Sequence, residues 1–255
     1  MNAHLLQLDL AWEDPATNLT RAAEAARRAD PAPGDLLVLP EMFDTGFSMN
    51  AATSIDQGNT LDAMRQIAAR HGACVLGGRT VAGTEGRGRN VATAVGPDGA
   101  VLCEYTKCHP FTLGGEHLAF DAGDGPKLFA WGGLTIAPII CYDLRFPELF
   151  RRAMRSGAEA FVVIACWPSA RHSHWRTLLP ARAVENQAYV LGCNRSGKDP
   201  KLEYMGGSMA VGPTGETLVE SFELNAVIRV PLDPAAVRRW RDKFPAWKDH
   251  RFIGA

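Results

Sequence analysis

The chain has 255 residues, of which 46% are hydrophobic and 22% charged, and its formal net charge is −1. This composition is typical of a globular protein, and a charge this balanced argues against nucleic acid or anionic membranes as partners. The N-terminus lacks the basic start and long apolar run of a signal peptide, and no apolar stretch approaches the roughly 18 residues of a membrane span. We therefore expect a cytoplasmic protein that binds neither nucleic acid nor membrane.

The apolar pattern predicts helices and strands along the whole chain. In the first half these are a strand at 4–10, a helix at 15–28, a strand at 36–39, a helix at 60–70, and strands at 74–78, 91–95 and 101–105. In the second half they are hairpin strands at 127–131 and 134–140, a helix at 147–155, a strand at 161–165, a helix at 173–186, strands at 189–194, 208–211, 217–220 and 226–230, and a C-terminal helix.

Hairpins are mixed with β-α units in this order. We therefore predict the α/β class, with a single domain over residues 1–255 in which helices cover packed sheets. The tail, about residues 240–255, is rich in tryptophan and phenylalanine. We expect it to pack on the domain or on a partner subunit.

Three predicted strands end on a residue with useful chemistry: Glu41, Lys107 and Cys141. Side chains at strand ends can converge on a crevice at the edge of a sheet. A free thiol has a pKa of about 8.5 and needs a base to take its proton, a role that suits Glu41. Lys107 and the backbone N–H of Tyr142 can stabilise the oxyanion formed when Cys141 attacks a carbonyl. These residues predict nucleophilic catalysis on a carbonyl or nitrile carbon.

The segments LPEMF around Glu41, YTKCHPF around Lys107 and CYDLRFPE from Cys141 resemble the three signature segments of the nitrilase, or carbon–nitrogen hydrolase, superfamily. The resemblance implies a Glu–Lys–Cys triad on a four-layer α-β-β-α sandwich, with a thioester acyl-enzyme. It also implies no metal and no cofactor, and a homodimer or larger assembly. Glu116 falls where many members carry a second glutamate, and we expect it to orient Lys107 or the substrate.

The segments at 39–47, 166–175 and 181–187 resemble the ω-amidase branch of this superfamily. Those enzymes hydrolyse the terminal amide of 2-oxo acids such as 2-oxoglutaramate and 2-oxosuccinamate. The resemblance implies a small amide substrate that carries a carboxylate. Arg171 can bind that carboxylate through two hydrogen bonds, and Trp167 and Phe43 can form walls of the pocket.

Several alternatives stay open or are rejected from the sequence. Another superfamily activity, nitrilase or N-carbamoyl hydrolase, is the nearest rival, and a catalytically silent binding protein on the same fold is another. Six scattered cysteines without a C-x-x-C pair argue against a disulfide framework. A thiol-redox or metal module is a third rival. Cys166, His172 and His174 lack an evident fourth zinc ligand. Residues 192–198 resemble a phosphate-binding loop, but Pro200 prevents the helix that such a loop requires.

Overall fold

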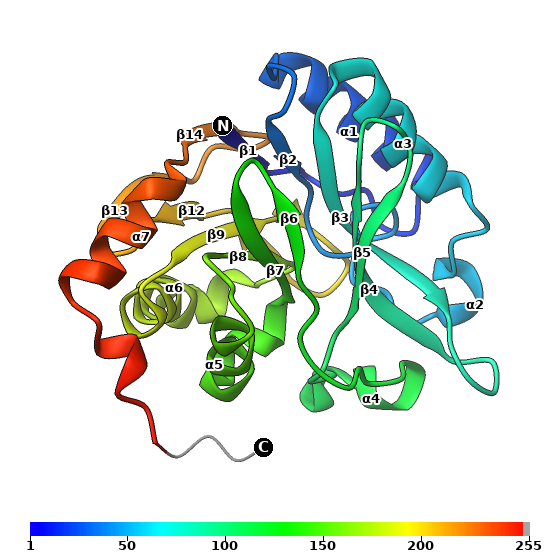
Figure 1. Cartoon of the computed structure of the whole chain (residues 1–255). Helices are drawn as coiled ribbons and strands as arrows, with labels where there is room; N and C mark the ends of the chain where they lie inside the picture. Colours follow the sequence, from blue (N-terminus) through cyan, green and yellow to red (C-terminus); the bar gives the residue numbers. More distant parts are fainter. Residues whose placement is uncertain (252–255) are drawn as a thin grey trace.

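The structure is a computed structural model that describes residues 1–251, and its main feature is a pair of six-stranded β-sheets (Figure 1). The first sheet has the order β14-β1-β2-β3-β4-β5, and the second has the order β13-β12-β9-β8-β7-β6. The strands of the first sheet are β1 (Asn2–Leu6), β2 (Leu36–Val38), β3 (Cys74–Ala82), β4 (Gly88–Val95), β5 (Val101–Thr106) and β14 (Val227–Pro231). Those of the second are β6 (Phe129–Trp131), β7 (Leu134–Ile140), β8 (Ala160–Ala165), β9 (Tyr189–Asn194), β12 (Ser208–Val211) and β13 (Thr217–Ser221).

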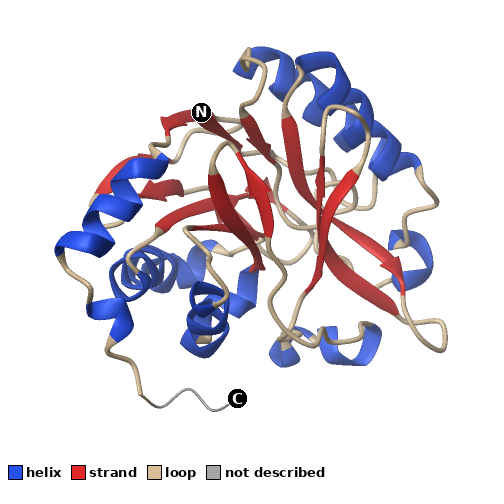
Figure 2. Ribbon diagram, in the orientation of Figure 1, coloured by secondary structure: helices blue, strands red, loops and turns tan. Residues whose placement is uncertain are grey.

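Helices cover the outer face of each sheet (Figure 2). The α-helices are α1 (Pro15–Ala29), α2 (Ala51–Ser54), α3 (Asn59–His71), α4 (Glu116–Ala119), α5 (Pro147–Arg155), α6 (His172–Asn186) and α7 (Pro234–Lys243). Two residues define the start of α1. Pro15 occupies its first turn, and the Asp14 side chain accepts a hydrogen bond from the backbone N–H of Thr17 at 3.1 Å.

The alternating side chains of β2 show how the layers pack. Leu36 and Val38 belong to the hydrophobic cluster that both sheets share, whereas Leu37 belongs to the cluster formed with α1 and α3. Side chains of α5 and α6 pack in turn on the second sheet. The predicted fold class is therefore confirmed: the chain is a single-domain α/β protein with an α-β-β-α sandwich.

Most predicted helices and strands are present, and the largest omission is a short hairpin. Strands β10 (Ser196–Lys198) and β11 (Glu203–Met205) pair with each other outside the two main sheets. The strand predicted at 4–10 ends at Leu6, because the chain beyond it leaves the first sheet and bonds to other segments, including the start of β10. The Leu8 carbonyl, for example, accepts from the backbone N–H of Ser196 at 2.8 Å.

The C-terminal segment packs on the same domain as far as the structure describes it. The Gln187 side chain donates to the Phe244 carbonyl at 2.6 Å and accepts from the backbone N–H of Trp247 at 3.0 Å. Residues 252–255 of the predicted tail lie outside the described residues. Within residues 1–251, none of the helices has the length and apolar character needed to cross a membrane.

Parallel pairing places several strand ends at one edge of the sandwich. Strands β7, β8 and β9 run parallel, so the residues that follow them emerge on the same side: Cys141 after β7 and Cys166 after β8. Strands β1, β2 and β3 are parallel in the first sheet, and Glu41 follows β2. A site formed by residues at these strand ends therefore lies at this edge of the sandwich.

The loop after β2 is anchored to two helices through Asp44, a carboxyl group that is 2% exposed. Its Oδ2 accepts from Thr60 Oγ1 at the start of α3 at 2.8 Å, and its backbone carbonyl accepts from the Asn18 side chain of α1 at 2.7 Å. Burial raises the pKa of Asp44 to about 6, and the carboxylate of Asp56 also raises it, although the Thr60 hydrogen bond opposes the shift. Ionised Asp44 therefore destabilises the fold at neutral pH.

We expect Asp44→Asn to increase the free energy of unfolding near pH 8. The folded-state pKa of about 6 lies above the unfolded value, so stability contributed by Asp44 is present at low pH and is lost as the pH rises through 6. The amide keeps an acceptor for Thr60 without the buried charge. The expected gain is about 1–3 kcal/mol above the folded pKa and shrinks towards pH 4.

Urea unfolding at several pH values measures this effect. Asp242→Asn, at an exposed position of α7, is the control and should leave the pH dependence unchanged. A stability gain for Asp44→Asn that is equal at all pH values, or a loss near pH 8, contradicts the assignment.

Candidate active site

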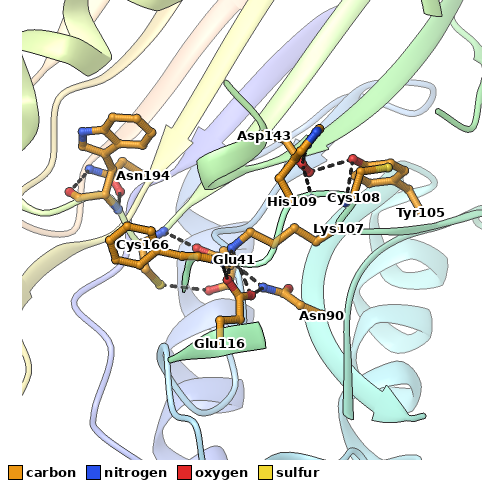
Figure 3. Close-up of polar contacts among 12 residues, drawn as sticks. Glu41, Asn90, Tyr105, Lys107, Cys108, His109, Glu116, Asp143, Cys166 and Asn194 are labelled. Atoms are coloured by element: carbon orange, nitrogen blue, oxygen red, sulfur yellow. Dashed lines mark hydrogen bonds and ion pairs between the residues drawn. The ribbon is translucent and has the colours of Figure 1, made fainter. Parts of the chain in front are cut away.

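Glu41 is fully buried at the end of a tight loop after β2. The loop packs closely on Gly78, where an added Cβ would lie 2.6 Å from the Glu41 Cα, so no larger residue fits there. The Glu41 Oε1 accepts from Lys107 Nζ at 2.9 Å and from Asn90 Nδ2 at 2.8 Å. Its Oε2 accepts from the backbone N–H of Cys166 at 2.8 Å. Both carboxylate oxygens are thus fixed by donors from other strands (Figure 3).

Lys107 follows β5 and is 1% exposed. Its ammonium also donates to Glu116, at 3.0 Å to Oε1 and 2.8 Å to Oε2. Burial alone lowers the pKa of Lys107, but the carboxylates of Glu116 and Glu41 outweigh it and hold the pKa well above its usual value. Lys107 is therefore a fixed positive charge.

Glu116 opens the short helix α4 and is fully buried. Besides Lys107, it receives hydrogen bonds from Asn90 Nδ2 at 2.9 Å and from the backbone N–H of Phe111 at 2.6 Å. The structure therefore places Glu116 against Lys107, in the cluster where the sequence predicts a supporting carboxylate. Its Oε1 and the Oε1 of Glu41 share two donors, the ammonium and the asparagine amide.

Cys141 directly follows β7 in an uncommon backbone conformation, with φ of +46°, and begins a 3₁₀ turn that extends to Arg145. Neighbouring elements hold this turn. Arg182 of α6 donates to the Leu144 carbonyl from Nε at 3.0 Å and from Nη2 at 2.8 Å. The backbone N–H of Tyr142 lies in the first turn, where N–H groups lack intrahelical acceptors.

Asp143 connects the Cys141 turn to the segment that carries Lys107. Its buried carboxylate accepts from the Tyr105 hydroxyl at 2.6 Å and from the backbone N–H of His109 at 2.9 Å. The His109 Nδ1 lies 2.7 Å from the same carboxylate. Because Tyr105 and His109 flank Lys107 in sequence, these contacts connect the ammonium segment to the turn that begins at Cys141. Figure 3 shows Asp143 beside Tyr105 and His109.

The Cys141 thiol is held in its neutral form by its surroundings. Burial raises its pKa well above the ordinary value, and the Glu41 carboxylate raises it further, while the Lys107 ammonium opposes the shift. The thiol is therefore not a preformed thiolate at neutral pH. A reaction at this sulfur requires a base that accepts the proton as the new bond forms.

Cys141 and Lys107 face a common cavity of about 40 Å³. Its lining residues are Phe47, Lys107, Phe111, Cys141, Tyr142, Arg145, Cys166, Trp167, Pro168, Arg171, Leu202 and Tyr204. Tyr142, Trp167 and Arg171, predicted as substrate contacts, are all among them. Leu202 and Tyr204 belong to the hairpin that the sequence did not reveal.

Phe43 is the predicted contact that the structure corrects. Its ring is fully buried in the hydrophobic cluster beneath α1 and α3, against Gly77, where an added Cβ would lie 3.1 Å from it. The loop turns between Glu41 and Phe43, so the ring points into the core. Phe47 lies at the cavity instead, with its ring centroid 5.1 Å from Lys107 Nζ.

Two guanidinium groups line the cavity together with the thiol. Arg171 lies 5.4 Å from the Phe111 ring centroid, and its backbone carbonyl accepts from Trp167 Nε1 at 2.8 Å. Arg145 lies 4.7 Å from the Trp167 ring centroid, with Nη1 3.1 Å from His174 Nδ1. Aromatic faces therefore hold two cations at the edge of an otherwise largely apolar cavity.

The chain matches the carbon-nitrogen hydrolase family over residues 3–242 and belongs to that family, as the sequence motifs predicted. It is therefore a hydrolase of carbon–nitrogen bonds. It is similar to omega-amidase YafV of Escherichia coli, with 39% identity over 96% of this chain and 94% of the relative. It is also similar to 2-oxoglutaramate amidase of Bacillus subtilis, with 31% identity over 96% of each chain. XC1258 of Xanthomonas campestris, a CN-hydrolase superfamily protein, superposes with a TM-score of 0.90 and 35% identity, covering 100% of this chain and 98% of that one.

Proposed function

We propose that this protein is a thiol-dependent amidase of the ω-amidase type, which releases ammonia from a small carboxylate-bearing amide such as 2-oxoglutaramate or 2-oxosuccinamate. The observation that carries the proposal is the buried Lys107 ammonium, held between Glu41 and Glu116 and facing the same cavity as Cys141. Relatives named omega-amidase and 2-oxoglutaramate amidase, similar over nearly the whole chain, support the substrate class.

In the first half-reaction the Cys141 sulfur attacks the amide carbonyl carbon, and its proton passes to the Glu41 carboxylate. The carbonyl π electrons move to oxygen, which becomes an oxyanion stabilised by the Lys107 ammonium and the Tyr142 backbone N–H. The oxyanion collapses and breaks the carbon–nitrogen bond. Glu41 returns its proton to the leaving nitrogen, so that ammonia departs and a thioester remains on Cys141.

In the second half-reaction water attacks the thioester carbon, and Glu41 accepts the proton that the water loses. The same two donors, Lys107 and the Tyr142 N–H, stabilise the second oxyanion. Its collapse breaks the carbon–sulfur bond, and the proton on Glu41 returns to the Cys141 sulfur. The products are a carboxylic acid and the original enzyme. Glu116 takes no proton in this scheme and keeps Lys107 in place.

The cavity supports a small substrate with an anionic end. At about 40 Å³ the cavity is small, and its lining combines aromatic side chains with cationic ones. Arg171 lies at the same cavity and offers a planar pair of N–H donors that matches a carboxylate. We propose that Arg171 binds the substrate carboxylate while Trp167 forms a wall.

We expect wild-type protein to release ammonia from 2-oxoglutaramate or 2-oxosuccinamate, and Cys141→Ala to release none above the uncatalysed rate, because the mutant lacks the nucleophile. A coupled ammonia assay measures both. Cys193→Ala, at a buried cysteine of β9 away from the cavity, is the control and should retain activity. The proposed substrate class is wrong if the wild type releases no ammonia from either amide but does release it from a nitrile or an N-carbamoyl compound.

We expect Arg171→Met to lower kcat/KM for 2-oxoglutaramate about 10- to 100-fold, mainly through KM, because a charge-assisted pair with the substrate is lost. A neutral amide of similar size should be hydrolysed at the wild-type rate. Arg176→Met is the matched control, since Arg176 lies on the exposed side of α6 and pairs with Glu220. Equal losses for charged and neutral amides argue against carboxylate binding by Arg171.

We also propose that the protein forms a homodimer through the face of α5 and α6. A groove of about 830 Å³ lies between these helices and the C-terminal segment, and Val184 and Phe244 at this groove are 56% and 54% exposed. Exposed apolar side chains around a groove favour burial against a second copy. The cytoplasmic location predicted from the sequence stays a prediction.

We expect wild-type protein to sediment as a dimer and Val184→Glu to sediment as a monomer, because a buried unpaired carboxylate opposes association. Sedimentation velocity at matched concentrations measures the difference. Leu224→Glu, at a residue 61% exposed before β14, is the control and should not change the assembly. A monomeric wild type contradicts the proposal.

A further inference from the structure

Asn90 of β4 bonds to both carboxylates of the buried charge cluster and to the backbone of Lys107. Its Nδ2 donates one hydrogen bond to Glu41 Oε1 at 2.8 Å and one to Glu116 Oε1 at 2.9 Å. Its backbone carbonyl accepts from the backbone N–H of Lys107 at 2.9 Å. The side chain is 1% exposed, so water does not replace these bonds. One residue therefore sets the positions of both carboxylates and of the ammonium segment (Figure 3).

The charges of the cluster explain why a neutral donor is needed at this position. The carboxyl groups of Glu41 and Glu116 flank the single ammonium of Lys107, and all three groups are buried. Two carboxylates this close favour uptake of a proton unless donors stabilise the ionised forms. The Asn90 amide offers two N–H groups on one nitrogen, one for each carboxylate, and adds no charge.

The Asn90 amide is bound through its donor end. Among residues 1–251 the buried Oδ1 of Asn90 has no hydrogen-bond partner. An unsatisfied buried acceptor costs stability, so the amide is held in place by its donors alone.

We propose that Asn90 is a positioning residue of the amidase, which keeps Glu41 ionised as the base and holds Glu41 and Glu116 on either side of Lys107. The proposal rests on the function proposed above. It predicts that loss of the Asn90 donors changes the pH at which the site becomes reactive. A role confined to the stability of the fold predicts no such change.

The test compares Asn90→Leu with Asn186→Leu in the full-length protein. Leucine has the same branched shape and the same number of side-chain heavy atoms as asparagine but no donor. Asn186 is a matched control because it is also fully buried, donates to the Arg182 carbonyl at 2.9 Å, and has an unpartnered Oδ1 among the described residues, yet lies outside the carboxylate cluster. The first measurement is the rate of Cys141 alkylation by iodoacetamide as a function of pH, and the second is kcat and KM for ammonia release.

In Asn90→Leu the acidic limb of the alkylation profile should move to higher pH by about one unit or more, because a carboxylate that has lost a donor takes up a proton more readily. The value of kcat should fall at least about tenfold while KM changes less than about threefold. The Asn186→Leu profile should superpose on that of the wild type. Asn90→Ser, which keeps one shorter donor, should shift in the same direction by less, and it provides the measurement if the leucine variant does not fold.

Two outcomes overturn the inference, and they are distinct. If the Asn90→Leu and Asn90→Ser profiles superpose on the wild-type profile, and activity falls only with the folded fraction, Asn90 is a structural residue. If the wild-type Cys141 is alkylated no faster than the other five cysteines, the thiol is not activated and the proposed amidase function itself fails.

Discussion

The Lys107 ammonium, 1% exposed to water, is stable because two carboxylates surround it at 2.8–3.0 Å. Removing a charge from water costs several kcal/mol unless partners replace the lost hydration. Here the partners overcompensate, because Glu41 and Glu116 leave the cluster with one negative charge in excess. Further donors are then required, and they come from Asn90 and from the backbone N–H groups of Cys166 and Phe111. The need to satisfy this cluster constrains every segment around it.

Only tertiary packing brings these donors together. Glu41 and Lys107 are 66 residues apart in sequence, and Glu41 and Cys166 are 125 apart. These distant residues come together because the sandwich places strand ends from both sheets at one edge. There the loop after β2 contacts the segments after β5 and β8. Hydrogen bonds between these segments hold them in place. The Asp143 carboxylate, for example, accepts hydrogen bonds from Tyr105 and His109. Rigid strands thus fix the positions of the site's side chains more precisely than an isolated loop does.

The sequence predicted the parts of this arrangement that follow from local patterns. Long apolar-periodic segments indicated the main helices, and abrupt strand ends indicated Glu41, Lys107 and Cys141. Asn90 was missed, because one polar residue at the start of a strand ordinarily faces solvent, and its partners are 26 and 49 residues away. The β10–β11 hairpin was missed because its strands have three residues each and lack apolar alternation. Phe43 was misplaced because proximity in sequence to Glu41 does not fix the direction of a side chain across a turn.

The neutral thiol of Cys141 fits a site whose buried charge is already unbalanced. A preformed thiolate would add a second excess negative charge beside Glu41, which is why burial and Glu41 together raise the pKa of Cys141. In the proposed mechanism, transfer of the thiol proton to Glu41 leaves the total charge unchanged, and attack then moves the negative charge from sulfur to the substrate oxygen. In that mechanism the oxygen is stabilised by Lys107 and the Tyr142 N–H, which the fold holds in place before substrate arrives. The proposed mechanism therefore displaces one charge over a short distance without burying another.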